Sequence, residues 1–376
     1  MANIVDQIEH ARKNEITSSF KPSRVLVIGA STGYGLSSRI SAAFSAKADT
    51  LGVYFERPPT EERSASAGFY NSMAFSYKAK EQGLRSEEIN GDAFSKECKE
   101  LTIAKAKEMG GQFDLVIYSL ASPRRLDPSD EKTYRACLKP IGSIYKNKTL
   151  DTDKKEVKEV VIEPANEDEI FGTEKVMGGE DWKLWTELLI EEGILAEGCK
   201  NIAYSYIGPE VTQPIYRNGT IGRAKEDLEN TGVLLDEKMK KMGIGEAYVS
   251  VNKAVVTQAS SAIPVVPLYV SILFKIMREL GTHEGCIEQT SRLFSSFLYT
   301  GNPTVFVDSK NRIRLDDWEM DPIVQEKIMS IWPKVNSANL TEMTNFQEYQ
   351  DEFLRLFGFA HPKVDYEKEV DPVNPY

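Results

Sequence analysis

The stretch that most constrains the fold is an apolar strand that runs directly into a glycine-rich turn and then a helix. Arg24 to Ile28 is aliphatic after its first residue, which is typical of a strand buried on both faces of a parallel sheet. The turn Gly29 to Gly35 follows with GxxxGxG spacing, and LSSRISAAFSAKA after it has the composition of a helix. Glycines let the backbone approach a pyrophosphate, and a helix N-terminus offers free N–H groups. This order predicts a dinucleotide-binding unit, with a simple tight turn as the alternative.

Strands and helices continue to alternate after this unit. Strands are predicted at residues 50–56, 113–119, 202–206 and 247–251, and a further strand is predicted to end at 89–92. Helices are predicted at 69–81, 95–109, 180–192 and 225–241. Such alternation is typical of a parallel sheet with helices on both faces. We therefore predict an α/β fold, an enlarged Rossmann-type sheet like that of short-chain reductases. Small β and helical elements are expected to be inserted over the site.

The length of 376 residues suits one large α/β domain with insertions or two domains. We predict a single enlarged Rossmann-type domain over residues 1–376. Residues 124–180 are rich in charge and poor in apolar periodicity, so we predict an insertion near the active site. Residues 300–376 are predicted to form a C-terminal cap. Within the insertion, Arg124 and Arg125 either meet the phosphates of a carrier group or are solvated surface charge.

Composition narrows the class of partner and the compartment. The net charge of −11 argues against a general affinity for nucleic acid or an anionic membrane. The four cysteines have no paired spacing, which indicates reduced thiols in a cytoplasmic protein and no zinc site. The N-terminus is too polar for a signal peptide, and the most apolar window, Ile263 to Met277, is too short to span a bilayer. That window is either a wall for an acyl chain or a core helix.

Several polar or small residues stand where predicted strands end. Glu56 closes the second strand and can accept hydrogen bonds from ribose hydroxyls, although an acid that merely closes a strand is the alternative. Its charge would repel a 2′-phosphate and favours NADH over NADPH, an inference that the neighbouring Arg57 weakens. Asp92 could contact an adenine edge, and Thr257 a nicotinamide amide. The small residues from Ser119 to Ala121 would let a cofactor lie across the strand end.

The candidate reactive groups are a tyrosine and a lysine. Tyr216 and Lys225 follow a predicted strand and turn, with eight residues between them. A tyrosine can place a neutral O–H on an oxygen that gains negative charge, and a lysine can hold a cofactor ribose and bias the tyrosine's proton. The three histidines, His10, His283 and His361, lie far from this segment in sequence, which disfavours a histidine-centred triad or metal site. No GxSxG elbow or Walker loop is present. The pattern points to hydride transfer.

Longer stretches then resemble a known family. The sequence resembles the FabV-type trans-2-enoyl-acyl reductases, enoyl-ACP and enoyl-CoA reductases with a Tyr-x8-Lys active site. The matching stretches are VLVIGASTGYGLSSRI, GVYFERP, INGDAFS, YSLASPRR, VMGGEDW, the Tyr216–Lys225 segment, VVTQASSAIPVVPLY and GTHEGCIEQ. They cover nearly the whole chain. Members of the family begin with a further segment of about twenty residues containing a His-Pro pair. We therefore expect a difference at the N-terminus that leaves the site unaffected.

The resemblance implies an NADH-dependent monomer that saturates the 2,3 double bond of an enoyl-CoA or enoyl-ACP substrate. It implies that Tyr216 and Lys225 are catalytic and that Tyr206 also faces the thioester. The implied cofactor contacts are Gly29, Ser31, Thr32, Gly33, Tyr34, Gly35, Glu56, Asp92, Ala93, Ser119, Leu120, Ala121, Lys225, Val256 and Thr257.

Two alternatives remain open. The first is a carbonyl-reducing short-chain dehydrogenase, which would need a third polar group beside the tyrosine. Ser205 is available, but in a strand that ends at Tyr206 its side chain should face away from that tyrosine. The second is a regulator that binds NADH without turnover.

Overall fold

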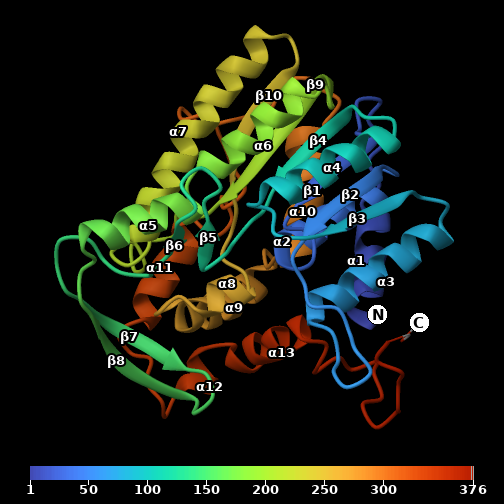
Figure 1. Cartoon of the computed structure of the whole chain (residues 1–376). Helices are drawn as coiled ribbons and strands as arrows, with labels where there is room; N and C mark the ends of the chain where they lie inside the picture. Colours follow the sequence, from blue (N-terminus) through green and yellow to red (C-terminus); the bar gives the residue numbers. More distant parts are fainter. Residues whose placement is uncertain (374, 376) are drawn as a thin grey trace.

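The computed structural model describes residues 1–373 and 375, and its centre is a seven-stranded parallel sheet (Figure 1). The strand order is β11-β10-β9-β4-β1-β2-β3. The strands are β1 (Arg24–Ile28), β2 (Asp49–Tyr54), β3 (Ser86–Asn90), β4 (Phe113–Tyr118), β9 (Leu195–Ser205), β10 (Gly245–Val251) and β11 (Arg312–Arg314). The predicted parallel, Rossmann-type sheet is confirmed.

Helices cover both faces of this sheet because its central strands are apolar on both sides. Leu26 and Ile28 of β1 face one core, and Val25 and Val27 face another. Burying each such side chain stabilises the fold by about 1.5–3 kcal/mol. The first face is covered by α4 (Lys96–Glu108), α6 (Glu180–Glu191) and α7 (Thr220–Lys241), and the second by α2 (Gly33–Phe44), α10 (Cys286–Leu293) and the π-helix η1 (Phe294–Leu298). Outside α2, a further layer is formed by α1 (Ala2–Lys13) and α3 (Ala67–Glu81).

The strand order reverses beside β1, which determines where a ligand can enter. From β1 the chain moves outward through β2 to β3 and then returns to β4 on the other side. The connections after β1 and β4 therefore diverge and leave a crevice at the carboxyl ends of these strands. Ligands of open parallel sheets bind at such a point.

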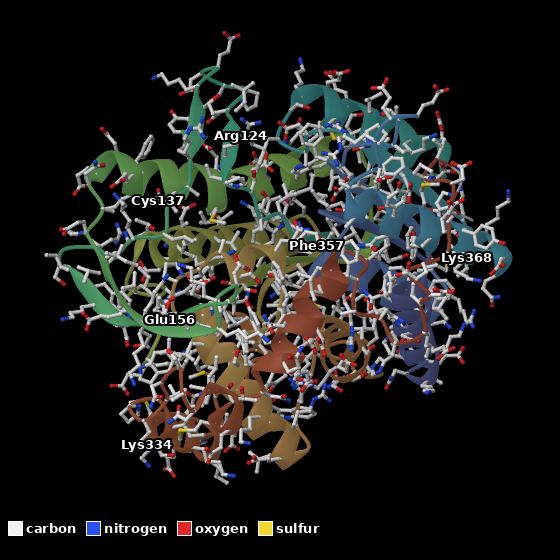
Figure 2. The ribbon with its side chains drawn as sticks, turned by 90° about the horizontal axis from the view of Figure 1, so that it is seen from below. Arg124, Cys137, Glu156, Lys334, Phe357 and Lys368 are labelled. Carbon is white, nitrogen blue, oxygen red and sulfur yellow. The ribbon has the colours of Figure 1, made fainter. Side chains whose placement is uncertain are left out.

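Residues 124–180 form two antiparallel strand pairs and a helix outside the sheet. The elements are β5 (Arg124–Leu126), β6 (Thr133–Arg135), β7 (Tyr145–Asp151), β8 (Glu156–Ile162) and α5 (Glu167–Met177). The helix α5 packs on α7, and β7 packs on α9. Figure 2 places Arg124, Cys137 and Glu156 of this region on the side of the molecule opposite to Lys368.

The C-terminal third combines a second apolar core with the last strand of the sheet. The helices that form or border this core are α8 (Gln258–Ser261), α9 (Val266–Leu280), α11 (Pro322–Ile331), α12 (Leu340–Met343) and α13 (Phe346–Leu356), whereas α10 and η1 of the same third cover the sheet. Most of the window from Ile263 to Met277 is the buried helix α9, so the core-helix alternative holds for most of it. The seventh strand, β11, was not predicted. Within residues 1–373 and 375, no helix combines the length and apolar character needed to cross a bilayer.

Candidate active site

A cavity of about 520 Å³ opens at the carboxyl ends of the strands. This volume lies within the range of small-molecule sites. Its walls come from the segments that follow β1, β2, β3, β4, β9 and β10, and from the N-terminal half of α7. Ile263 and Val266, at the start of the apolar window, add a hydrophobic border. The cavity therefore lies where the reversal of strand order predicts a ligand.

Nearly all of the predicted site residues meet in this cavity. Tyr206, Tyr216 and Lys225 line it, together with Gly29, Ser31, Thr32, Gly33, Tyr34, Glu56, Asp92, Ala93, Ser119, Leu120, Ala121 and Thr257. Gly35 and Val256 do not. Val256 borders a smaller cavity of about 170 Å³, which shares Thr32 and Gly33 with the large one.

Two glycines bring the first turn of α2 close to the sheet. Gly29 has a φ of +91°, and a Cβ there would lie 2.4 Å from the Ser119 carbonyl oxygen. A Cβ on Gly35 would lie 1.9 Å from the Gly29 carbonyl oxygen. Only a glycine therefore lets the helix and the turn pack this closely behind the cavity. Thr32 precedes the helix and makes no side-chain cap hydrogen bond. The first N–H groups of α2 are thus left for a ligand, as a pyrophosphate requires.

Glu56 lies just beyond β2, between the glycine turn and the start of α3. Its carboxylate accepts hydrogen bonds from the hydroxyls of Ser31 (2.7 Å) and Ser66. Gly68 leaves room for it, because a Cβ there would lie 2.0 Å from Glu56 Oε1. The neighbouring Arg57 donates to the Ser64 carbonyl and does not line the cavity. The fixed charge at this end of the cavity is therefore negative, which suits ribose hydroxyls and opposes a 2′-phosphate.

A buried ion pair supports the Asp92–Phe94 turn, which lines the cavity. The Lys99 ammonium donates to the Ala93 carbonyl (2.9 Å) and to Asp181 Oδ1 (2.8 Å). Trp185 also donates to the Ala93 carbonyl, and the Tyr118 hydroxyl donates to Asp181 Oδ2. No local pattern in the sequence indicates this support, because its members come from three separate elements.

Tyr216 precedes α7 and offers an unpartnered hydroxyl to the cavity. Its carbonyl accepts from the backbone N–H groups of Gly219 (3.1 Å) and Gly222 (3.0 Å), which fixes the turn. The ring packs edge-on against Tyr206, with centroids 4.9 Å apart. Among residues 1–373 and 375, none forms a hydrogen bond with the Tyr216 hydroxyl. Burial raises the pKa of Tyr216, an effect that the charge of Arg217 only partly offsets, so the phenol stays protonated and can donate.

Lys225 extends from α7 to the C-terminal end of β9. Its ammonium donates to the Tyr204 carbonyl at 3.1 Å, which leaves two N–H donors for a ligand. Burial lowers the pKa of Lys225 to about 8, although the Glu229 carboxylate partly opposes this shift. The lysine is therefore a cation at neutral pH and loses its charge in mildly alkaline solution.

Two polar residues that were not predicted as cofactor contacts line the cavity, and each has a buried polar atom without a partner among the described residues. The amide oxygen of Asn252 accepts from the Ser250 hydroxyl (2.7 Å), and its buried Nδ2 has no partner among the described residues. The buried Ser205 hydroxyl also has none. Ser205 was expected to face away from Tyr206, and the direction of its side chain stays a prediction. The strand β9 ends at Ser205, and both residues line the cavity.

Neither arginine at the start of the insertion lines the cavity. The Arg125 side chain is 1% exposed and bonds to Glu180 Oε2 at 2.7 Å and to the Lys175 carbonyl at 2.8 Å. Arg125 is therefore a buried structural cation, which contradicts both the phosphate contact and the solvated charge. Arg124 is exposed.

One group of residues in the described part of the chain has the composition of a metal site. The ligand atoms of His283, Glu348 and Glu352 lie within 4.8 Å of one another. The Glu348 carboxylate is already paired with the Arg278 guanidinium, and none of the three residues lines the large cavity. We assign this cluster no chemistry.

Three family models match consecutive parts of the chain. Residues 1–61 match the NAD(P)H binding domain of trans-2-enoyl-CoA reductase, and residues 63–299 match the trans-2-enoyl-CoA reductase catalytic region. Residues 307–370 match an enoyl reductase FAD binding domain.

Curated relatives match over nearly the whole chain. An enoyl-acyl-carrier-protein reductase (NADH) from Serratia proteamaculans is 52% identical over 370 residues, which are 98% of this chain and 92% of the relative. A trans-2-enoyl-CoA reductase from Euglena gracilis is 52% identical over 368 residues, which are 98% of this chain and 67% of the relative.

Solved structures match this fold at two levels of similarity. The trans-2-enoyl-CoA reductase of Treponema denticola in complex with NAD has a TM-score of 0.93 and 48% identity, and the match covers 98% of this chain and 92% of that one. A FabI from Alistipes finegoldii, at 14% identity and a TM-score of 0.51, shares the fold alone.

The residues in 307–370 do not fit a flavin dinucleotide. In the Rossmann type of site, a dinucleotide pyrophosphate is held by a strand, a glycine-rich turn and a helix N-terminus in succession, and residues 307–370 lack this type of site. This segment has a single glycine, Gly358, which follows α13, and its one strand is the three-residue β11. The glycine turn that fits a dinucleotide lies instead between β1 and α2.

Proposed function

This chain belongs to the trans-2-enoyl-CoA reductase family, and we propose that it uses NADH to reduce the 2,3 double bond of trans-2-enoyl thioesters of CoA or acyl-carrier protein. The observation that carries the proposal is the Tyr216 hydroxyl. It is protonated, has no protein partner in the described residues, and lies in the cavity with Lys225 at the carboxyl ends of the strands.

The cavity residues divide into two ends for the cofactor. At the adenosine end, the N–H groups of α2 would hold the pyrophosphate, and Glu56 would accept from the ribose hydroxyls. At the nicotinamide end, Lys225 has free N–H donors for the second ribose, and Asn252 borders the same part of the cavity with a buried amide nitrogen that has no partner among the described residues. When bound, NADH supplies the hydride that is added to C3 of the enoyl group.

Tyr216 stabilises the charge that develops on the substrate. As C3 gains a hydride, the electron pair of the double bond shifts and negative charge grows on the thioester oxygen. The Tyr216 O–H donates to that oxygen, and one donor aimed at a developing oxyanion in a dry site is worth about 3–4 kcal/mol. The Lys225 ammonium holds the ribose and adds positive potential to the site. C2 is afterwards protonated by Tyr216 or through water.

The decisive experiment is Tyr216→Phe, assayed with crotonyl-CoA and NADH. We expect kcat to fall about 100- to 1000-fold, as the loss of 3–4 kcal/mol requires, while the KM for NADH stays within about twofold. Tyr145→Phe is the matched control, because Tyr145 is equally buried but lies on β7 outside the cavity. We expect it to retain wild-type turnover. Unchanged turnover of the Tyr216 variant would refute the assignment.

Carbonyl reduction is the second candidate, and the placement of Ser205 in the cavity favours it. A carbonyl-reducing enzyme would oxidise NADH with acetoacetyl-CoA and leave crotonyl-CoA intact. We expect the reverse, and we expect NADPH to be a poor substitute because of Glu56. Tight NADH binding without turnover of either thioester would indicate a regulator.

We further propose that the protein is a cytoplasmic monomer. Four free cysteines support a reducing compartment, and the family resemblance supports the monomer. Light scattering behind size-exclusion chromatography tests the second point, since a dimer would double the mass of 42.2 kDa.

A further inference from the structure

A buried carboxylate of the C-terminal segment, Glu319, lies behind Tyr206 and does not itself line the cavity. Glu319 follows β11 in a turn, and none of its surface is exposed. Glu319 Oε1 accepts from the hydroxyls of Tyr206 (2.9 Å) and Tyr269 (2.7 Å). Glu319 Oε2 accepts from the Ala254 backbone N–H at 2.7 Å. Tyr206 lines the cavity, whereas Glu319 and Tyr269 do not.

These contacts limit what Tyr206 can do. A phenol has one proton, and in this structure Tyr206 directs it at Glu319, away from the cavity. The Tyr206 oxygen can then only accept hydrogen bonds from the cavity side. It cannot stabilise a thioester oxyanion in this state, and Tyr216 is left as the donor.

A proton on Glu319 would reverse this arrangement. Because the Ala254 N–H occupies Oε2, a proton on the carboxyl group belongs on Oε1, between the two tyrosines. The protonated Oε1 can donate to the Tyr206 oxygen while it still accepts from Tyr269, and Tyr206 would then be free to turn its own proton to the cavity. The carboxyl group thereby determines the direction of the Tyr206 hydrogen bond.

The surroundings of Glu319 favour protonation of its carboxylate. The ionisable groups that face it are Tyr206 after β9, Tyr269 on α9, Lys253 after β10, Tyr34 on α2 and Asp316 in the same turn. Burial raises the pKa of Glu319 above its ordinary value, and the Asp316 charge adds to this effect. The Lys253 charge and the hydrogen bonds from Tyr269 and the Ala254 N–H oppose it without cancelling it.

We propose that Glu319 is a positioning residue for the reduction, and that Tyr206 stabilises the thioester oxyanion only while Glu319 carries a proton. The inference rests on the proposed function. It assigns Tyr216 as the constant donor and Tyr206 as a second donor that depends on pH.

Glu319→Gln provides a direct test because the geometry allows its amide one orientation. The Ala254 N–H requires the amide oxygen, so the amide nitrogen faces Tyr206 and Tyr269 and donates to both. Tyr206 then directs its proton to the cavity at every pH. We expect kcat/KM for crotonyl-CoA to rise about tenfold in the wild type as the pH falls through the pKa of Glu319, the gain from one further hydrogen bond. The glutamine variant should hold the higher value without this rise.

The test includes controls for a merely structural effect. In a Tyr206→Phe background, Glu319→Gln should leave kcat/KM unchanged, because there is no hydroxyl to redirect. If the glutamine variant does not fold, Tyr269→Phe replaces it. Loss of the hydrogen bond from Tyr269 should raise the pKa of Glu319. The increase in kcat/KM as the pH falls should therefore begin at a higher pH.

The outcomes separate the two proposals. A wild type that binds NADH but reduces no enoyl thioester refutes the proposed function. An active wild type whose pH profile is unchanged by Glu319→Gln, or unmoved by Tyr269→Phe, refutes only the role of Glu319. An equal effect of Glu319→Gln with and without the Tyr206 hydroxyl does the same.

Discussion

Replacing Glu229 with glutamine removes the central carboxylate of a buried ion-pair cluster beside the Tyr216 turn. On α7, Glu229 bonds to Arg217, which follows Tyr216 in the chain, at 2.8 Å and to Arg312 of β11 at 3.0 Å. The three side chains are only 7%, 15% and 10% exposed, in that order. The cluster thus ties the Tyr216 turn to the edge strand of the sheet.

The expected loss in the free energy of unfolding depends on which ion-pair partners each arginine retains. Removing one partner of a buried ion pair costs about 3–5 kcal/mol, because a buried charge is left unpaired. Arg312 keeps Asp308 at 2.8 Å, whereas Arg217 keeps, within the described part of the chain, only Glu226 at 3.8 Å. The glutamine oxygen can still accept one hydrogen bond. We therefore expect the low end of the range, a loss of about 3 kcal/mol in the free energy of unfolding.

Urea unfolding followed by circular dichroism measures this loss, and the same helix offers a matched control. Glu226 contacts the same arginine, but its side chain is 45% exposed and the distance is 3.8 Å. Glu226→Gln should therefore cost no more than about 0.5 kcal/mol. A Glu229→Gln variant that loses less than about 1 kcal/mol, or no more than the Glu226 variant, would refute the view that this cluster anchors the turn.

Two further predictions concern the nicotinamide end of the cavity. Because burial lowers the pKa of Lys225 to about 8, its charge is lost as pH rises, and kcat/KM for NADH should fall through this region. Lys225→Arg should abolish that decline, whatever its absolute rate, and a decline kept by the arginine variant would assign it to another group. Asn252→Asp keeps the acceptor for the Ser250 hydroxyl but removes the orphaned Nδ2 donor. It should weaken NADH binding at least fivefold by fluorescence titration, about 1 kcal/mol, and an unchanged dissociation constant would contradict this contact.

The parts of the fold that could be predicted are the buried strands that consist of consecutive apolar residues. The aliphatic runs of β1 and β4 identify strands covered on both faces, and the sheet contains both. The strand β11 could not be predicted in this way, because two of its three residues are arginines. Arg312 is buried there because Asp308, four residues earlier, and Glu229, 83 residues earlier on α7, neutralise it, and the local sequence does not reveal the second partner.

The same distinction applies to the site. Gly29, Glu56, Tyr216 and Lys225 could be selected because each belongs to a local pattern or to a recognised motif. Asn252 carries no such pattern. It was not selected because only the fold shows that this residue borders the cavity and that its amide nitrogen is buried without a partner among the described residues. Only the arrangement of strands β9 and β10 in space shows that Ser205 lines the same wall.

Glu319 shows why the C-terminal segment belongs to the site despite its distance in sequence. Its carboxylate receives hydrogen bonds from Tyr206, Tyr269 and the Ala254 N–H, which come from three separate parts of the chain. These donors can be satisfied together only after β11 has paired with β10 and the turn that follows it has docked. A buried carboxylate without its partners is costly, so docking of this segment and formation of the Tyr206 site stabilise each other. Residues 307–370 therefore complete the reductase cavity from behind, in place of the flavin site that their glycine content does not support.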